Sequence, residues 1–206
     1  MDHALNAMVV HDMKNALALL EADLEQLNRH PDLPPEASKA YRRCIELKNR
    51  LIGFLTLYRS EEKGLHPVLR DCPVLDFLEA FLDGALWANE GIQALVARER
   101  MARDAENRMA YFDEDLVEIA LESALNNASR YARKKVEIWF EQDASGIAFF
   151  VLDDGPGLSP EKSPSTGLGL ALCDAVAKAH QHDGRHGTAR LSNSAEGGAL
   201  FEMRLP

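Results

Sequence analysis

The 206-residue sequence predicts an α+β fold, in which an N-terminal helical hairpin precedes an α/β sandwich of helices on a mixed sheet. Two patterns predict this fold. Apolar residues recur every three or four positions over residues 2–29 and 36–63, as on one face of a helix. Short apolar runs separated by Gly-rich turns dominate the second half, as in strands. The turn at Gly64–Pro67 predicts domains of residues 1–66 and 67–206.

The two N-terminal helices are separated by a proline-rich break at residues 30–35. Because Pro cannot continue a helix and the loop is short, the helices should run antiparallel. Their apolar stripes include Leu20 and Leu24 in the first helix and Ile45 and Leu55 in the second. One hairpin cannot bury both stripes. We therefore expect two copies to associate through the hairpin as a four-helix bundle, which makes a homodimer.

The second domain alternates predicted helices and strands. Helices are expected over residues 74–87, from residue 114 through residue 128, and from residue 167 onward. Strands are expected over residues 93–98, 108–112, 135–141, 147–152, 189–192 and 199–205, with helices on one face of the sheet. Asp113 should cap the middle helix, because its carboxylate can accept from free N–H groups of the first turn. In strand 135–141, Val136, Ile138 and Phe140 should alternate with charged or exposed positions, apart from Trp139.

The composition is that of an ordinary globular protein with a formal net charge of −10. This charge disfavours non-specific binding to nucleic acid or to an anionic membrane, because both are polyanions. No apolar run reaches the length of a membrane span, and no signal peptide is recognisable. The three cysteines, Cys44, Cys72 and Cys173, form no disulfide framework and should be small core residues. We expect a cytoplasmic protein that contacts neither nucleic acid nor membrane.

The stretch from Val151 to Leu172 has the most informative pattern. Asp153 stands at the tip of a predicted strand, and the glycines that follow let the backbone turn sharply and approach a ligand closely. Gly167 and Gly169 open a helix, whose free N–H groups and dipole favour an anion. An acidic side chain at a strand end can accept a hydrogen bond from an amino group. The stretch could thus hold a nucleotide, with the base at one end and the phosphates at the other.

These motifs resemble the ATP-binding domain shared by gyrase, Hsp90, histidine kinases and MutL. The family's D-x-G-x-G motif is present as Asp153, Gly155 and Gly157, and its later G-x-G-L motif as Gly167, Gly169 and Leu170. The resemblance implies that Asp153 binds the adenine amino group. It also implies that the segment Thr166, Gly167, Leu168, Gly169 and Leu170 lines the phosphate side.

His11 lies on the first predicted helix, pointing away from its apolar stripe. A neutral imidazole is a competent nucleophile, since its ordinary pKa is about 6.5. The order His11, Asp12 and Asn15 resembles the H-[ED]-x-x-[NT] phosphoacceptor segment of two-component sensor histidine kinases. The resemblance implies that His11 takes the γ-phosphoryl group, that Asp12 is the general base, and that Asn15 positions water during dephosphorylation of a partner. Ala16 departs from the proline common after the polar residue, so the helix lacks that kink.

Asn127, Arg130 and Tyr131 match the family's N-A-x-[KR]-[YFH] motif. Hard oxygen ligands suit Mg²⁺, so the amide oxygen of Asn127 could bind a magnesium ion that bridges ATP phosphates. Arg130, three residues later on the helix, could meet phosphate, and Tyr131 would border the nucleotide.

Three features near this site depart from the family pattern. Ser123 replaces a frequent amide, Asp154 replaces a frequent asparagine, and the segment between Gly157 and Gly167 is a short lid without Phe. A short lid should exclude water less completely and could need the helical domain for closure. The histidine-rich segment from His180 to His186 is either a metal site or, as in relatives, the turn that ends a helix, and the turn is the favoured interpretation.

The resemblance implies an ATP-dependent protein-histidine kinase that autophosphorylates His11, passes the phosphoryl group to an aspartate of a response-regulator receiver domain, and could also dephosphorylate that regulator. The stimulus would come from a further sensor domain or from a separate protein. The first alternative is a histidine phosphotransfer protein with a non-functional ATP site, and ATP binding distinguishes it. An anti-sigma-type serine kinase and a purely structural dimerisation module are the others; His11 argues against the serine kinase.

Overall fold

The computed structural model describes residues 18–20, 22–23, 35–84, 91–158 and 167–206. The chain forms two compact units, Met1–Tyr58 and Arg59–Pro206. The sequence-predicted residues His11, Asp12, Asn15 and Thr166 lie outside the described residues. The predicted boundary between residues 66 and 67 stays a prediction.

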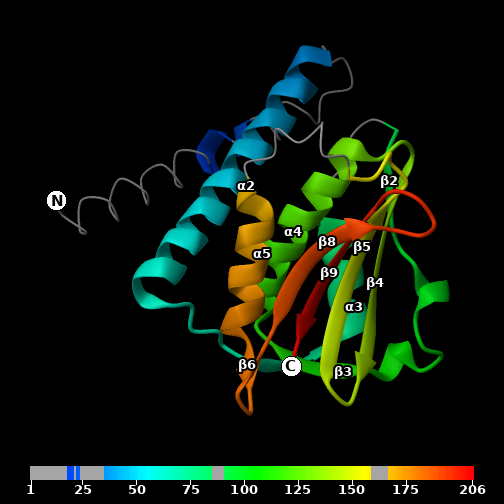
Figure 1. Cartoon of the computed structure of the whole chain (residues 1–206). Helices are drawn as coiled ribbons and strands as arrows, with labels where there is room; N and C mark the ends of the chain where they lie inside the picture. Colours follow the sequence, from blue (N-terminus) through cyan, green and yellow to red (C-terminus); the bar gives the residue numbers. More distant parts are fainter. Residues whose placement is uncertain (1–17, 21, 24–34, 85–90, 159–166) are drawn as a thin grey trace. The chain divides into compact units, whose positions relative to one another are not determined.

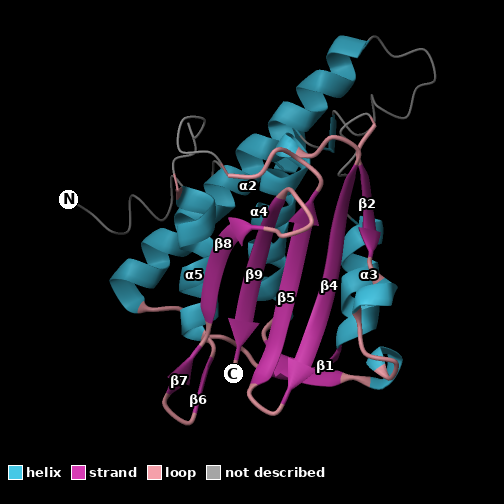
Figure 2. Ribbon diagram, turned by 45° about the vertical axis from the view of Figure 1, so that its right-hand side comes forward, coloured by secondary structure: helices cyan, strands magenta, loops and turns pink. Residues whose placement is uncertain are grey.

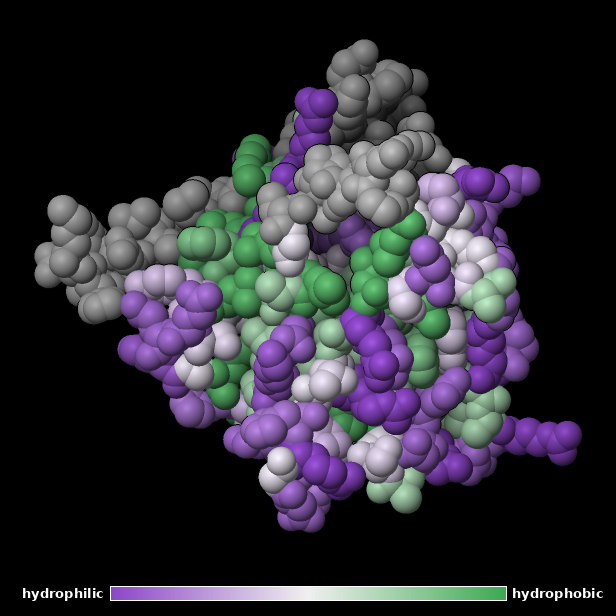
Figure 3. All heavy atoms as spheres, in the orientation of Figure 1, coloured by the Kyte–Doolittle hydropathy of each residue, from purple (hydrophilic) through white to green (hydrophobic). Residues whose placement is uncertain are grey.

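In the first unit, residues 18–20 and 22–23 are helical, and helix α2 (Pro35–Lys63) runs into the second unit. Its bounds agree with the predicted helix over residues 36–63. Cys44 and Thr56 are buried, and the Thr56 hydroxyl donates to the carbonyl of Ile52 at 2.9 Å. Leu47 and Phe54 remain more than half exposed, at 56% and 53%. Figure 3 shows apolar residues gathered over α2.

The second unit is built on a five-stranded mixed sheet (Figures 1 and 2). Its spatial order is β2 (Gln93–Val96), β4 (Lys135–Asp143), β5 (Gly146–Asp153), β9 (Ala199–Leu205) and β8 (Thr188–Asn193). The β2–β4 pair is parallel and the other pairs are antiparallel. In this order β5 lies between β4 and β9, so Asp153, its last residue, is flanked on both sides.

Three helices accompany this sheet: α3 (Val74–Gly84), α4 (Glu114–Tyr131) and α5 (Leu168–Ala179). Figure 2 shows α4 and α5 side by side behind the sheet. On the helical face Phe77, Phe112 and Phe149 pack edge to face, with ring centroids 5.3–6.3 Å apart. The α+β sandwich with a mixed sheet, predicted from the apolar patterns, is confirmed.

Several short elements complete the unit. Strand β1 (Arg70–Pro73) pairs antiparallel with β3 (Met109–Phe112), and β6 (Gln181–His182) pairs with β7 (Arg185–His186). Two 3₁₀ helices, η1 (Arg98–Arg100) and η2 (Ala105–Asn107), follow β2. The sequence did not predict β1, β6 or β7. The part of the first predicted helix of this domain beyond residue 84 lies outside the described residues.

The opposite face of the sheet is also buried, which corrects the expected alternation in β4. Trp139, Phe150 and Leu152 form a second apolar cluster with Ala97 and Ala148. Glu137 is 5% exposed, although its neighbours in the cluster are apolar. Strand β4 is therefore buried on both faces from Val136 to Phe140, because η1 and its flanking residues pack where solvent was expected.

Candidate functional site

Asp153 ends β5 with only 4% of its surface exposed. Its Oδ1 atom accepts hydrogen bonds from the backbone N–H of Gly155 at 2.8 Å and of Ala199 at 3.3 Å. Burial raises the pKa of Asp153, and these two hydrogen bonds only partly oppose it. No donor from a described residue reaches Oδ2, so that oxygen remains available to a donor from a ligand.

Glycines let three backbone segments meet around Asp153. A Cβ atom on Gly155 would lie 2.4 Å from the carbonyl oxygen of Tyr131, at the end of α4. A Cβ on Gly157 would lie 2.6 Å from Oδ1 of Asn193, and one on Gly198 would lie 1.7 Å from the carbonyl oxygen of Asp153. Gly157 and Gly198 also have φ values of +78° and +79°, which glycine adopts without strain. Only glycine permits these contacts.

Asn193, at the end of β8, holds the chain where it leaves this turn. Its Oδ1 accepts from the N–H of Leu158 at 2.6 Å, and its Nδ2 donates to the carbonyl of Leu158 at 3.4 Å. Sequence reasoning missed both Asn193 and Gly198 as site residues. The adjacent pair Gly197–Gly198 was the available signal, since two glycines suit close backbone approach.

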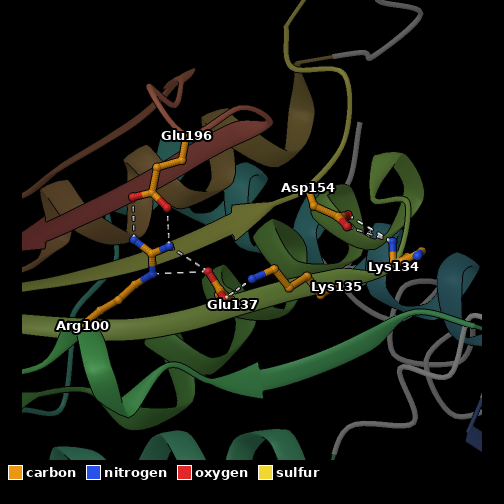
Figure 4. Close-up of polar contacts among 6 residues, drawn as sticks. All are labelled: Arg100, Lys134, Lys135, Glu137, Asp154 and Glu196. Carbon is orange, nitrogen blue, oxygen red and sulfur yellow. Dashed lines mark hydrogen bonds and ion pairs between the residues drawn. The ribbon is translucent and has the colours of Figure 1, made fainter.

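Asp154 points to Lys134, in the loop after α4 (Figure 4). Its carboxylate accepts from the backbone N–H of Arg133 at 2.7 Å and of Lys134 at 3.1 Å. Its own N–H donates to the carbonyl of Lys135 at 3.3 Å. Burial opposes ionisation, but these N–H groups outweigh it and lower the pKa of Asp154. The carboxylate of Asp154 therefore connects the end of β5 to the loop between α4 and β4 through hydrogen bonds.

Helix α4 carries Asn127, Arg130 and Tyr131. Asp113 caps it as predicted, since Oδ1 accepts from the N–H of Leu116 at 3.0 Å. Asn127 is half-buried, whereas Arg130 and Tyr131 are exposed. Because residues three and four apart share a helix face, Asn127, Arg130 and Tyr131 follow one side of the C-terminal half of α4.

The start of α5 lies against the middle of α4. A Cβ on Gly169 would lie 2.9 Å from Oγ of Ser123, which stands one turn before Asn127 on α4. Gly167 is the N-cap of α5 in a left-handed conformation, with no side chain bonded to the helix end. A Cβ on Gly167 would meet nothing within 4 Å. Gly167 thus offers no side chain to the first N–H groups of α5, a helix end of the kind that favours an anion.

Leu168 is half-buried, while Gly167, Gly169 and Leu170 are exposed. Helix α4 thus contacts the Asp153 turn through the Tyr131 carbonyl and the start of α5 through Ser123. The carboxylate of Asp153, the amide side chain of Asn127 and the start of α5 therefore lie around the C-terminal half of α4. These residues fit an adenine nucleotide with a hard divalent cation.

The histidine-rich segment has a structural role at His180. Its Nε2 accepts from the N–H of Asp113 at 3.0 Å, and its Nδ1 lies 2.9 Å from the carbonyl of Val176, to which it donates. Burial lowers the pKa of His180, consistent with this neutral tautomer. Both nitrogens are occupied by backbone groups, so His180 is not a metal ligand. No cluster of metal-binding side chains occurs within the described ranges.

Cys44, Cys72 and Cys173 are all buried. Burial raises the pKa of Cys72 and of Cys173 to about 12 each, so both thiols stay protonated near neutral pH. The prediction of small core residues is confirmed. No described helix is long and apolar enough to cross a membrane.

Comparison with known proteins agrees with this geometry. Residues 112–206 match the family model described as "Histidine kinase-, DNA gyrase B-, and HSP90-like ATPase". The match begins at the last residue of β3 and includes α4, the Asp153 turn and α5. The second unit therefore contains an ATPase domain of this class.

Similarity extends over nearly the whole chain. Sensor histidine kinase CpxA of Escherichia coli K12 is 25% identical over 222 residues, which cover 96% of this chain and 45% of CpxA. The solved histidine kinase AdeS of Acinetobacter baumannii shares the fold, with a TM-score of 0.58, 22% identity and coverage of 95% of this chain and 96% of AdeS. Full-length ShkA in complex with AMPPNP gives a TM-score of 0.67 at 18% identity, covering 100% of this chain and 46% of ShkA.

Together these matches make the chain similar over nearly its whole length to sensor histidine kinases, as the sequence motifs indicated. The chain spans less than half the length of CpxA.

Proposed function

We propose that this chain is an ATP-dependent protein-histidine kinase that autophosphorylates His11 and passes the phosphoryl group to an aspartate of a response-regulator receiver domain. The observation that carries the proposal is the buried carboxylate of Asp153. Its Oδ1 is occupied by two backbone N–H groups, and no described donor reaches Oδ2. Such an acceptor at the bottom of a glycine-lined turn suits the amino group of adenine.

The remaining site residues take roles that match their positions. The start of α5, from Gly167 through Leu170, would bind phosphate oxygens together with Thr166, which precedes it in sequence. Asn127 would supply an amide oxygen to Mg²⁺, Arg130 would contact phosphate, and Tyr131 would border the nucleotide. The bound magnesium ion would neutralise charge on the phosphate oxygens.

The chemistry on the protein side is a nucleophilic displacement at phosphorus. A ring nitrogen of neutral His11 forms the new N–P bond while the bond from phosphorus to the ADP oxygen breaks, and Asp12 accepts the imidazole proton. The phosphoryl group then moves from His11 to a carboxylate oxygen of the receiver aspartate. When the chain instead dephosphorylates the receiver, Asn15 would orient the water that hydrolyses the receiver's acyl phosphate.

We also propose that two chains associate through the helical hairpin. The half-exposed Leu47 and Phe54 stand seven residues apart on α2, so they share one face that a second copy could bury. The stimulus would come from a further sensor domain or a separate protein. Action in the cytoplasm, where ATP and receiver domains meet, fits this role.

The experiment that tests the proposal measures ADP binding and labelling from γ-labelled ATP with Mg²⁺, using wild type and Asp153→Asn. An amide at position 153 is nearly isosteric but no longer carries the negative charge that favours an amino donor. Wild type should bind ADP and incorporate label, and the variant should lose most of both. A wild-type chain that binds no adenine nucleotide would instead support the alternative of a histidine phosphotransfer protein with a non-functional ATP site.

A further inference from the structure

Arg100, the last residue of η1, joins two acidic side chains from distant parts of the chain (Figure 4). Its guanidinium binds both carboxylate oxygens of Glu196, through Nη1 at 2.9 Å and Nη2 at 2.7 Å. It also binds Oε2 of Glu137 through Nε at 3.2 Å and Nη2 at 3.0 Å. Lys135 Nζ reaches the other oxygen of Glu137 at 2.6 Å.

The Arg100 guanidinium lies over the ring of Trp139, a member of the second apolar cluster. Its central carbon lies 4.9 Å from the ring centroid of Trp139, and Trp139 stacks on Phe150 with 5.0 Å between centroids. Burial opposes ionisation of Glu137, but hydrogen bonds from Lys135 and Arg100 outweigh it and lower the pKa of Glu137. This is a partly buried, multiply bonded ion cluster rather than a solvated surface pair.

One carboxylate lies on a strand that flanks β5, and the other lies in the turn that leads into the strand on the opposite side of β5. Glu137 lies on β4, directly opposite Leu152, the residue before Asp153. Glu196 lies in the turn between β8 and β9. Because the sheet order is β4–β5–β9, Arg100 links β4, on one side of β5, to the turn that enters β9, on the other side.

The Glu196 turn leads directly to the Asp153 carboxylate. The turn closes with the N–H of Ser194 donating to the carbonyl of Gly198 at 3.1 Å. Gly198 packs against the backbone of Asp153, and the next residue, Ala199, donates its N–H to Oδ1. A shift of this turn would change the hydrogen bond that orients the carboxylate.

We propose that Arg100 is a positioning residue for the adenine end of the nucleotide site, acting through Glu196 and the β8–β9 turn to orient the carboxylate of Asp153. The inference rests on the proposed function, since it assumes that Asp153 binds the adenine amino group. Loss of the Arg100–Glu196 pair should weaken ADP binding roughly three- to tenfold, the effect of one weakened hydrogen bond to a charged group.

The experiment compares Arg100→Gln and Glu196→Gln with Arg98→Gln. Arg98 is a matched control, because it lies on the same 3₁₀ helix but pairs with Glu79 and Glu106, away from the flanks of β5. Glu196 is 63% exposed at its side chain, so Glu196→Gln should fold even if Arg100→Gln does not. Each chain is titrated with ADP and with purine riboside diphosphate, which lacks the adenine amino group.

The proposal expects weaker ADP binding by Arg100→Gln and Glu196→Gln, with unchanged binding of the purine analogue and unchanged behaviour of Arg98→Gln. The double variant should be no worse than Arg100→Gln, since both changes break one connection. Unchanged ADP affinity would overturn the inference, and so would an equal loss for both nucleotides, which indicates general damage to the fold. Failure of wild type to bind ADP would instead refute the proposed function.

Discussion

Replacing Gly198 with alanine tests how closely the β8–β9 turn packs against the end of β5. Gly197 provides a matched control, because both glycines have positive φ values: +94° at Gly197 and +79° at Gly198. A Cβ on Gly197 meets nothing within 4 Å, whereas one on Gly198 lies 1.7 Å from the carbonyl oxygen of Asp153. The two variants share the backbone strain and differ in the steric contact.

The magnitude follows from the contact. Alanine in the left-handed region costs about 1–2 kcal/mol at either position. At Gly198 the 1.7 Å contact with the Asp153 carbonyl must also open by roughly 1.8 Å to reach ordinary packing. Forced backbone displacement of this kind costs a further 1–3 kcal/mol, about 2–12 °C in melting temperature for a unit of this size. The displaced Asp153 should also bind ADP roughly 10- to 100-fold more weakly.

The assay is thermal unfolding and ADP titration of wild type, Gly197→Ala and Gly198→Ala. Gly197→Ala should lose some stability and keep its ADP affinity, while Gly198→Ala should lose more stability and most of its affinity. Equal melting temperatures and equal ADP affinities for the two variants would refute the assigned packing of the turn.

Acidification should weaken ADP binding at a pH above that expected for an ordinary aspartate, because burial raises the pKa of Asp153 and the ionised form is the acceptor; calorimetric titration across pH checks this. Stability should fall as the pH drops below about 6.5, because the folded state holds His180 neutral while the unfolded state gains a proton. His180→Gln should remove this dependence in urea unfolding, and His182→Gln, at an exposed residue, should leave it intact. Asp154→Ala should lower the free energy of unfolding by about 0.5–2 kcal/mol, as loss of a side-chain cap does, and Asp154→Asn should lower it less, since it keeps one acceptor. Urea unfolding of both variants measures this difference.

Apolar periodicity predicted the main elements because each buries a regular face. Helix α2 and strands β5 and β9 lie close to their predicted bounds, and Asp113 caps α4 as expected. Strand β1 could not be found in this way. It has four residues and ends in Pro73, and only pairing with β3 makes it a strand.

The environment of Asp153 depended on contacts that no local pattern contains. The motif indicated the aspartate and its glycines, but Asn193 reaches the turn from the end of β8 and Gly198 from the residue before β9, both far along the chain. Likewise Glu137 looked like a solvent-facing residue of β4. Its burial follows from Arg100, which is 37 positions away in sequence. Long-range partners of polar residues are set by topology rather than by spacing.

Phosphorylation of His11 is the central claim, and its most direct test is incubation with γ-labelled ATP and Mg²⁺. Wild type is compared with His11→Gln and with His3→Gln, a control at another histidine of the same N-terminal segment. The account predicts acid-labile, alkali-stable label in wild type and His3→Gln, and none in His11→Gln. Label that persists in His11→Gln, or its absence from a wild-type chain that binds ATP, would contradict it.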